Sequence, residues 1–373
     1  MIPFIDLKKQ YRRIEKEVDQ AVKNVFEHGQ YILGPEVAEL EKRLADFAGS
    51  KYCLACSSGT DALLMAFMAY DLKAGDAVFT TPFTFFATVE MIALTGATPV
   101  FADIDPETYN IDPEKLRDAI IRVKKEGKLT PKMIVPVDIF GQTVDYDAIM
   151  AIAKEFDLPV VEDGAQSMGA TYKGKCAPSF GAIGCTSFFP AKPLGCYGDG
   201  GAVFTDDKDL YDKMFSILVH GRGGDKYDNI RIGLNARLDT VQAAVLLQKL
   251  NIFAEEIELR QTVAANYAAA IGDAIKLPVI AKDCVSVYAQ YCVRSPEFEK
   301  IQAELRANDI PSARYYPIPM HQLKAMEYLG YKTGDMPVAE TVAKDIFALP
   351  MHPYLDEETI QKIGSVIKAA VGK

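Results

Sequence analysis

Short apolar runs alternate with helix-like segments through the first half of this 373-residue chain, and no other feature limits its fold as strongly. Each run has the length of a buried strand and is bounded by Gly, Pro or Asp. The alternation predicts an α/β fold, in which helices cover both faces of a mostly parallel sheet and ligands bind at the carboxyl ends of the strands. The runs are residues 76–81, 98–103, 132–138, 158–162, 183–188 and 202–205, and the helix-like segments are 61–70, 86–94, 113–126 and 146–156.

The second half of the chain has a different pattern. Its closing amphipathic segment, 357–371, follows Asp356 as helix N-cap, and short strand candidates lie in 285–293. We therefore predict a large α/β domain over residues 1–251 and a smaller C-terminal α+β domain over 252–373. The other helices expected are 7–27, 209–219, 240–250 and 255–271.

Charge and cysteine content limit the possible partners and the cellular location. The chain has 41 basic and 51 acidic residues, so its net charge of -10 disfavours nucleic acid and anionic membranes as partners. No membrane span or secretory signal is recognisable, and seven scattered cysteines fit reduced thiols in the cytoplasm. Cys53 and Cys56 have C-x-x-C spacing but stand in an apolar run, which favours a buried strand over redox or zinc chemistry. Four histidines far apart in sequence do not predict a metal site.

A first candidate for ligand binding is Ser-Ser-Gly-Thr-Asp at residues 57–61. It follows a predicted strand and opens an apolar helix, where unpaired amide groups and the helix dipole attract a phosphate. Gly59 would permit close approach, and Thr60 would add a hydroxyl donor. The alternative is an ordinary helix cap, for which the same residue types are favoured.

Two further candidates follow strands. Asp163 stands at the end of an apolar run, where its carboxylate can hold a proton on a heterocyclic nitrogen or cap a helix. Lys192 lies between Pro190 and Pro193 in apolar surroundings that can desolvate its amine and make it a nucleophile. The alternative for Lys192 is a solvated surface charge. An amine, a carboxylate and a phosphate site are together what pyridoxal 5'-phosphate requires.

With these residues the sequence resembles the DegT/DnrJ/EryC1/StrS family of nucleotide-sugar aminotransferases, which have the aspartate-aminotransferase fold (fold type I of pyridoxal phosphate enzymes). The resemblance covers nearly the whole chain. It includes Ile-Asp-Leu at 5–7, Gly-Gln-Tyr-Ile-Leu-Gly-Pro-Glu at 29–36, Gly-Leu-Asn-Ala-Arg-Leu-Asp at 233–239 and Leu-Pro-Met-His-Pro-Tyr at 349–354.

The resemblance implies a role for each cofactor contact. Lys192 would bond to the cofactor aldehyde, and Asp163 would pair with the pyridinium nitrogen. Asn235, in the Gly-x-Asn-x-Arg motif, would reach the phosphate from the neighbouring subunit of a homodimer with shared active sites. The other implied contacts are Gly59, Thr60 and Ser187 with the phosphate, Gln166 with the phenolic oxygen, and Phe85 stacked on the ring.

The sequence is most similar to the branch of the family that aminates the 3-keto group of a UDP-2-acetamido-2-deoxy-hexuluronate for surface polysaccharide such as O-antigen. Residues 286–294 and 316–320 carry this similarity, together with the segment around Lys192. The branch implies L-glutamate as amino donor and places Tyr315 and Tyr316 at the sugar, although Tyr315 stands where the branch is expected to have His. Arg237 can pair with a carboxylate, either that of the donor or that of the uronate.

Two alternatives stay open on sequence grounds. One is an aminotransferase for another nucleotide keto sugar, such as a 4-keto-6-deoxy sugar, with the same machinery. The other is a non-catalytic regulator on the same fold, which would be expected to lack the lysine or the acid. Related dehydratases have His in place of the lysine, so Lys192 disfavours them.

Overall fold

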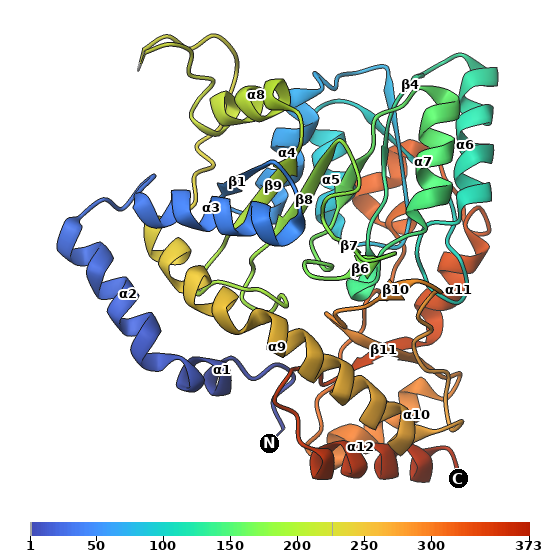
Figure 1. Ribbon diagram of the computed structural model, residues 1–373. Helices are drawn as coiled ribbons and strands as arrows, with labels where there is room; N and C mark the ends of the chain where they lie inside the picture. Colours follow the sequence, from blue (N-terminus) through green and yellow to red (C-terminus); the bar gives the residue numbers. More distant parts are fainter. Residues whose placement is uncertain (1, 226) are drawn as a thin grey trace.

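The computed structural model describes residues 2–225 and 227–373 (Figure 1). Its centre is a sheet made of two parts, with strand orders β1-β9-β8-β5 and β3-β2-β4. Parallel bridges from Ile134 to Val160 and from Val137 to Asp163 join β4 to β5, so the two parts form one continuous sheet. The strands are β1 (Tyr52–Cys56), β2 (Asp76–Thr80), β3 (Thr98–Phe101), β4 (Thr130–Val135), β5 (Val161–Asp163), β8 (Ile183–Ser187) and β9 (Gly201–Thr205).

The strand directions confirm the predicted mostly parallel sheet. β2 pairs in parallel with β3 and β4, and β5 pairs in parallel with β8. β9 is the exception, because it runs antiparallel to both β8 and β1. The carboxyl ends of β5 and β8 therefore meet at the same edge of the sheet.

Helices cover both faces of this sheet, as the alternating burial of β1 illustrates. Leu54 and Cys56 point into a core shared with α4, α5 and α8, whereas Cys53 and Ala55 point into a core shared with α3 and α9. Both cysteines are thus buried in a strand, as predicted, and α6 and α7 extend the second face over β2 and β4. These helices are α3 (Pro35–Ala48), α4 (Gly59–Ala69), α5 (Phe86–Leu94), α6 (Pro113–Glu126), α7 (Tyr146–Phe156), α8 (Lys208–Leu218) and α9 (Thr240–Ile271).

The two helices predicted over 240–250 and 255–271 are wrong, because α9 is one continuous helix of 32 residues. The residues between them include neither Pro nor Gly, and Phe253 is buried with its ring 5.5 Å from that of Phe47 in α3. The first half of α9 packs on α3, and its second half packs on the C-terminal part of the chain (Figure 1). The division at 251/252 stays a prediction, and it falls inside this helix.

The C-terminal part contains a two-stranded sheet and several helices. The short strands expected within 285–293 are two, formed at the ends of this range and not by residues 286–290. Asp356 caps the last helix as predicted, accepting a hydrogen bond from the amide of Thr359. The elements are β10 (Cys284–Val285), β11 (Tyr291–Arg294), β12 (Ile346–Leu349), α10 (Phe298–Ala307), α11 (Pro337–Asp345) and α12 (Glu357–Ala370), and β10 pairs with a hairpin of β6 (Thr171–Tyr172) and β7 (Lys175–Cys176).

The predicted N-terminal helix is divided into α1 (Leu7–Arg13) and α2 (Glu15–His28), which meet at Ile14. Ile14 and Val18 pack against Val245 of α9. In the part of the chain that the structure describes, no helix combines the length and apolar character needed to cross a membrane.

Candidate active site

The predicted site residues gather at the carboxyl edge of β5 and β8. Asp163 ends β5, Ser187 ends β8, and Lys192 lies in the loop that follows β8. Gly59 and Thr60 form the first turn of α4, which packs against β8. The fold thus brings together three segments that are far apart in sequence.

The amino end of α4 touches the end of β8 so closely that only glycine fits at residue 59. A Cβ atom on Gly59 would lie 2.7 Å from the Cβ of Ser187. Ser58 caps the helix, since its hydroxyl accepts from the amide of Asp61 at 3.0 Å. Within residues 2–225 and 227–373, the amides of Gly59 and Thr60 have no hydrogen-bond partner. Capping and anion binding are therefore compatible here, because Ser58 serves the first and leaves donors for the second.

Asp163 is buried at 4% exposure and held by two hydrogen bonds. Its Oδ2 accepts from the Thr88 hydroxyl at 2.7 Å, and its Oδ1 accepts from the amide of Ala165 at 3.2 Å. Burial raises the pKa of this carboxyl, and the Thr88 hydrogen bond opposes that rise. No helix begins in residues 164–170, so the alternative of a helix cap is wrong for Asp163. Thr88 comes from α5 and was not identified from the sequence.

Lys192 is half-buried and lies in the loop between β8 and β9. The loop is closed at its base by a hydrogen bond of 2.8 Å from the amide of Cys196 to the oxygen of Phe188, and the Lys192 amide donates to Phe189. Burial lowers the pKa of the Lys192 amine to about 8, and the negative charge of Asp163 opposes that shift. An amine with this pKa is partly neutral near neutral pH, which a nucleophile requires.

Gln166 is oriented by two contacts. Its Oε1 accepts from the amide of Phe140 at 2.7 Å, and its Nε2 donates to the Tyr316 hydroxyl at 3.0 Å. Phe140 has a left-handed backbone with φ of 60°, which is uncommon outside glycine and typical of functional sites. Phe140 and Tyr316 therefore belong to the site's framework, and the Gln166 contact with a cofactor stays a prediction.

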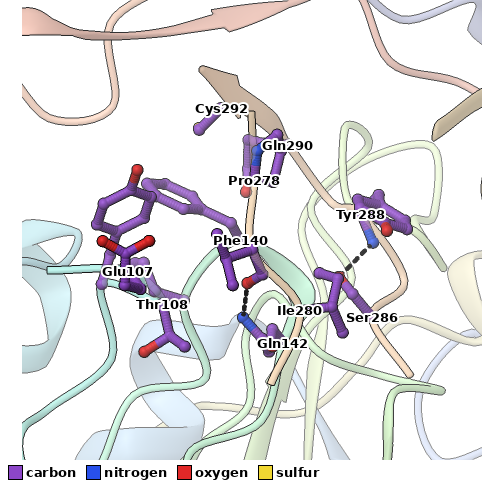
Figure 2. Close-up of a pocket in the computed structure, with 13 residues that line it drawn as sticks. Glu107, Thr108, Phe140, Gln142, Pro278, Ile280, Ser286, Tyr288, Gln290 and Cys292 are labelled. Atoms are coloured by element: carbon purple, nitrogen blue, oxygen red, sulfur yellow. Dashed lines mark hydrogen bonds between the residues drawn. The ribbon is translucent and has the colours of Figure 1, made fainter. Parts of the chain in front are cut away.

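Phe140 also lines a small cavity, and none of the predicted site residues lines it (Figure 2). Its volume of about 20 Å³ suffices for one water molecule and not for a sugar. Two buried polar atoms among its lining residues, Tyr109 Oη and Gln290 Oε1, have no partner in the described chain. A cavity of this size does not serve as the active site for a nucleotide sugar.

The structure also shows the surroundings of the remaining predicted residues, which are Phe85, Tyr315, Asn235 and Arg237. Phe85 precedes α5 and is 60% exposed, whereas Tyr315 packs near Phe4 with 6.5 Å between ring centroids. Asn235 is exposed and accepts a hydrogen bond from Arg237, whose Nε is buried without a partner in the described chain.

The segment around Asn235 runs beside the end of β1 in its own chain. The oxygen of Ala236 accepts from the amide of Ser57 at 2.7 Å, and Arg237 bridges to Cys56. Asn235 is therefore next to the start of α4 in its own subunit, a proximity that the sequence did not indicate.

A lysine, a buried carboxylate and a helix start with amides left free in the described chain, all at one edge of this sheet, are the arrangement expected of an aminotransferase of the aspartate-aminotransferase type. Residues 12–368 match the DegT/DnrJ/EryC1/StrS aminotransferase family, and the chain belongs to this family. The predicted family, fold type and enzyme class are thereby confirmed.

Three comparisons support this assignment. The chain is 50% identical to UDP-2-acetamido-2-deoxy-3-oxo-D-glucuronate aminotransferase of Pseudomonas aeruginosa, over 97% of this chain and 98% of the relative. It is 47% identical to a DegT DnrJ EryC1 StrS aminotransferase of Brucella abortus, whose crystal structure matches with a TM-score of 0.97 over 100% of both chains. NtdA of Bacillus subtilis, solved with bound cofactor PMP, matches with a TM-score of 0.90 at 26% identity, over 100% of this chain and 85% of NtdA.

Proposed function

We propose that this pyridoxal-phosphate-dependent enzyme transfers an amino group from L-glutamate to the 3-keto carbon of a UDP-2-acetamido-2-deoxy-hexuluronate. The observation that carries the proposal is the convergence of Lys192 and Asp163 with the amino end of α4 at one edge of the sheet. The substrate is inferred from the Pseudomonas relative, which is similar over almost its full length. The product would be a 3-amino sugar acid for surface polysaccharide such as O-antigen, made in the cytoplasm.

The residues present fit pyridoxal phosphate. The unpaired amides of Gly59 and Thr60 and the hydroxyl of Ser187 form a cradle that a Cβ on residue 59 would fill. Asp163 would hold the proton on the ring nitrogen, Gln166 would contact the phenolic oxygen, and Phe85 would stack on the ring. When bound, this cofactor accepts the amino group from the donor and passes it to the keto sugar.

The chemistry assigned to this chain's own residues is proton transfer and charge stabilisation. Lys192 Nζ would hold the cofactor through its aldehyde and, as a free amine, would move the proton at the substrate carbon. Its pKa of about 8 suits both tasks, because neutral and charged amine are both populated near that pH. Asp163 would stabilise a proton on the ring nitrogen, and the hydrogen bond from Thr88 supports its negative charge.

Substrate recognition is assigned to Arg237, Tyr315 and Tyr316. Arg237 is half-buried and has an unpaired buried Nε in the described chain, so it suits a carboxylate of the donor or of the uronate. The Tyr316 hydroxyl accepts from Gln166 and retains its own proton for donation to a sugar oxygen.

A homodimer with shared active sites forms part of the proposal. It is supported by exposed apolar side chains in two segments that flank Asn235 and Asp239. Ile32 bridges to Asp239, and the oxygen of Tyr31 accepts from the amide of Thr240. The exposed residues are Tyr31, Ile32, Leu33, Ile230 and Ile232.

The substrate is tested by assaying a panel of UDP- and dTDP-linked 3-keto and 4-keto sugars with L-glutamate while 2-oxoglutarate formation is followed. We expect the highest kcat/KM with the UDP 3-keto uronate. A preference for a 4-keto-6-deoxy sugar would instead favour the alternative aminotransferase. Absence of turnover with every sugar, in protein that binds pyridoxal phosphate, would favour the non-catalytic regulator.

Shared sites are tested by mixing two inactive variants, Lys192→Ala and Asn235→Trp. In a heterodimer with shared sites, one site carries both lesions and the other carries neither, so mixing should restore activity. We expect recovery to rise with the heterodimer fraction, measured by native mass spectrometry. If heterodimers form and activity does not return, Asn235 serves the site of its own chain.

A further inference from the structure

A buried lysine of α9, Lys249, contacts the loop that carries Lys192. Its side chain is 1% exposed, and its Nζ donates to the oxygen of Gly195 at 2.5 Å. The same Nζ lies 4.2 Å from the ring centroid of Tyr197. In the part of the chain that the structure describes, Lys249 forms no ion pair with a carboxylate. Burial lowers the pKa of its amine to about 8, and the negative charge of Glu256 opposes that shift.

A second side chain of α9 holds the same segment. Gln242 accepts from the amide of Tyr197 at 2.9 Å through Oε1 and donates to the oxygen of Tyr197 at 3.4 Å through Nε2. Gln242 and Lys249 are seven residues apart, which is two helical turns, so they lie on the same face of α9. One helix face thus holds residues 195–197 at two points.

The loop is held at its base by the hydrogen bond between Cys196 and Phe188 and by burial of Leu194 and Cys196 in the core, but its backbone has little hydrogen bonding of its own. Among the described residues, the backbone hydrogen bond found within 189–195 is the one from the amide of Lys192 to the oxygen of Phe189, at 2.8 Å. Gly195 lies so close to Phe189 and Pro190 that a Cβ would be 2.6 Å from each carbonyl oxygen. Displacement of Gly195 would therefore move the segment on which Lys192 stands.

We propose that Lys249, assisted by Gln242, is a positioning residue that fixes the loop of the active-site lysine through the oxygen of Gly195. The inference rests on the proposed role of Lys192. Lys249 acts on the loop backbone and not on the charge of Lys192, since burial and Asp163 are the influences on the pKa of Lys192. A cation is suited to this task because a charge-assisted hydrogen bond and a cation–π contact are both stronger in a dry interior.

The decisive variant is Lys249→Met, which keeps the side-chain length and apolar stem and removes the donor and the charge. Lys208→Met, an exposed lysine of α8, is the matched control. Amide hydrogen exchange over residues 188–200 and kcat and KM for glutamate are measured on holoenzyme. A third measurement starts from protein freed of pyridoxal phosphate and follows the rate at which the visible absorption of the bound cofactor returns when pyridoxal phosphate is added back. The absorption reports the bond between Lys192 and the aldehyde, which forms with loss of water.

In Lys249→Met we expect faster amide hydrogen exchange confined to residues 188–200. The rate at which the cofactor absorption returns and the value of kcat should each fall by roughly 10- to 100-fold. KM for glutamate should change little, and Lys249→Arg, which keeps charge and donor, should recover part of both rates. If Lys249 only stabilised the fold, Lys249→Met would have a lower melting temperature, while its rate of cofactor reconstitution and its kcat would equal those of the wild type. This outcome would overturn the proposal.

Gln242→Met provides a second test, because it removes a neutral anchor from a half-buried position and is less disruptive to the fold. We expect the changes in amide hydrogen exchange, in the rate of cofactor reconstitution and in kcat to have the same direction as in Lys249→Met and to be smaller. If Lys249→Met does not fold and Gln242→Met has unchanged exchange and reconstitution, the proposal is wrong. Failure of the proposed function is recognised separately, since Lys192→Ala would then keep the visible absorption.

Discussion

Lys192→Ala is expected to lose the visible absorption of enzyme-bound pyridoxal phosphate and nearly all activity. The amine that bonds to the aldehyde and moves the proton is absent, so kcat should fall by roughly 100- to 10,000-fold from the lost acid–base group alone, and further from the lost nucleophile. Absorption spectra and steady-state kinetics on purified protein measure both effects.

Lys213→Ala is the control for the loss of a lysine, since Lys213 lies on α8 and pairs with Asp71 away from the site. It should leave spectrum and kcat unchanged. Turnover of Lys192→Ala at the wild-type rate would show that another amine serves the reaction, and the assignment of Lys192 would have to be abandoned.

Asp163→Asn should produce the other large effect. The amide keeps the size of the carboxylate but removes the negative charge beside the ring nitrogen, so kcat should fall by roughly 100- to 1,000-fold. Cofactor binding through the phosphate cradle should persist, because Gly59, Thr60 and Ser187 are unchanged. Stopped-flow spectra of the reaction with glutamate would locate the loss in proton transfer.

The comparison variant for this test is Asp147→Asn, which changes an exposed carboxylate that pairs with Lys173. It should have wild-type kcat. A folded, cofactor-loaded Asp163→Asn enzyme with unchanged kcat would contradict the pairing of this carboxylate with the ring nitrogen.

The sequence predicted well those elements whose first and last residues are themselves capping or terminating signals. The helix predicted over 113–126 matches α6 at both ends, because Asp112 caps it, Pro113 opens it and Gly127 ends it in a left-handed conformation. The two helices predicted within α9 illustrate the opposite case. None of residues 251–254 interrupts that helix, and the contact of Phe253 with Phe47 of α3, which accompanies its continuity, is not visible in the sequence.

The same distinction applies to the candidate site. Lys192, Asp163 and Gly59 were identified from the sequence because each stands in a motif whose chemistry is visible within a few neighbouring residues. Their convergence follows from the predicted sheet, since the carboxyl ends of parallel strands lie at one edge. The sequence by itself thus determined the fold class and the family, and it provided the candidates for the reacting groups.

Only the tertiary structure decided which groups support them. Thr88 is 75 residues from Asp163, and Lys249 is 54 residues from Gly195, yet each pair is joined by a hydrogen bond. A threonine and a lysine on helices look ordinary in sequence, because their roles depend on a partner that arrives through the packing of α5 and α9 on the sheet. Local patterns record what neighbouring residues dictate, whereas contacts between distant segments exist only once the core has closed around them.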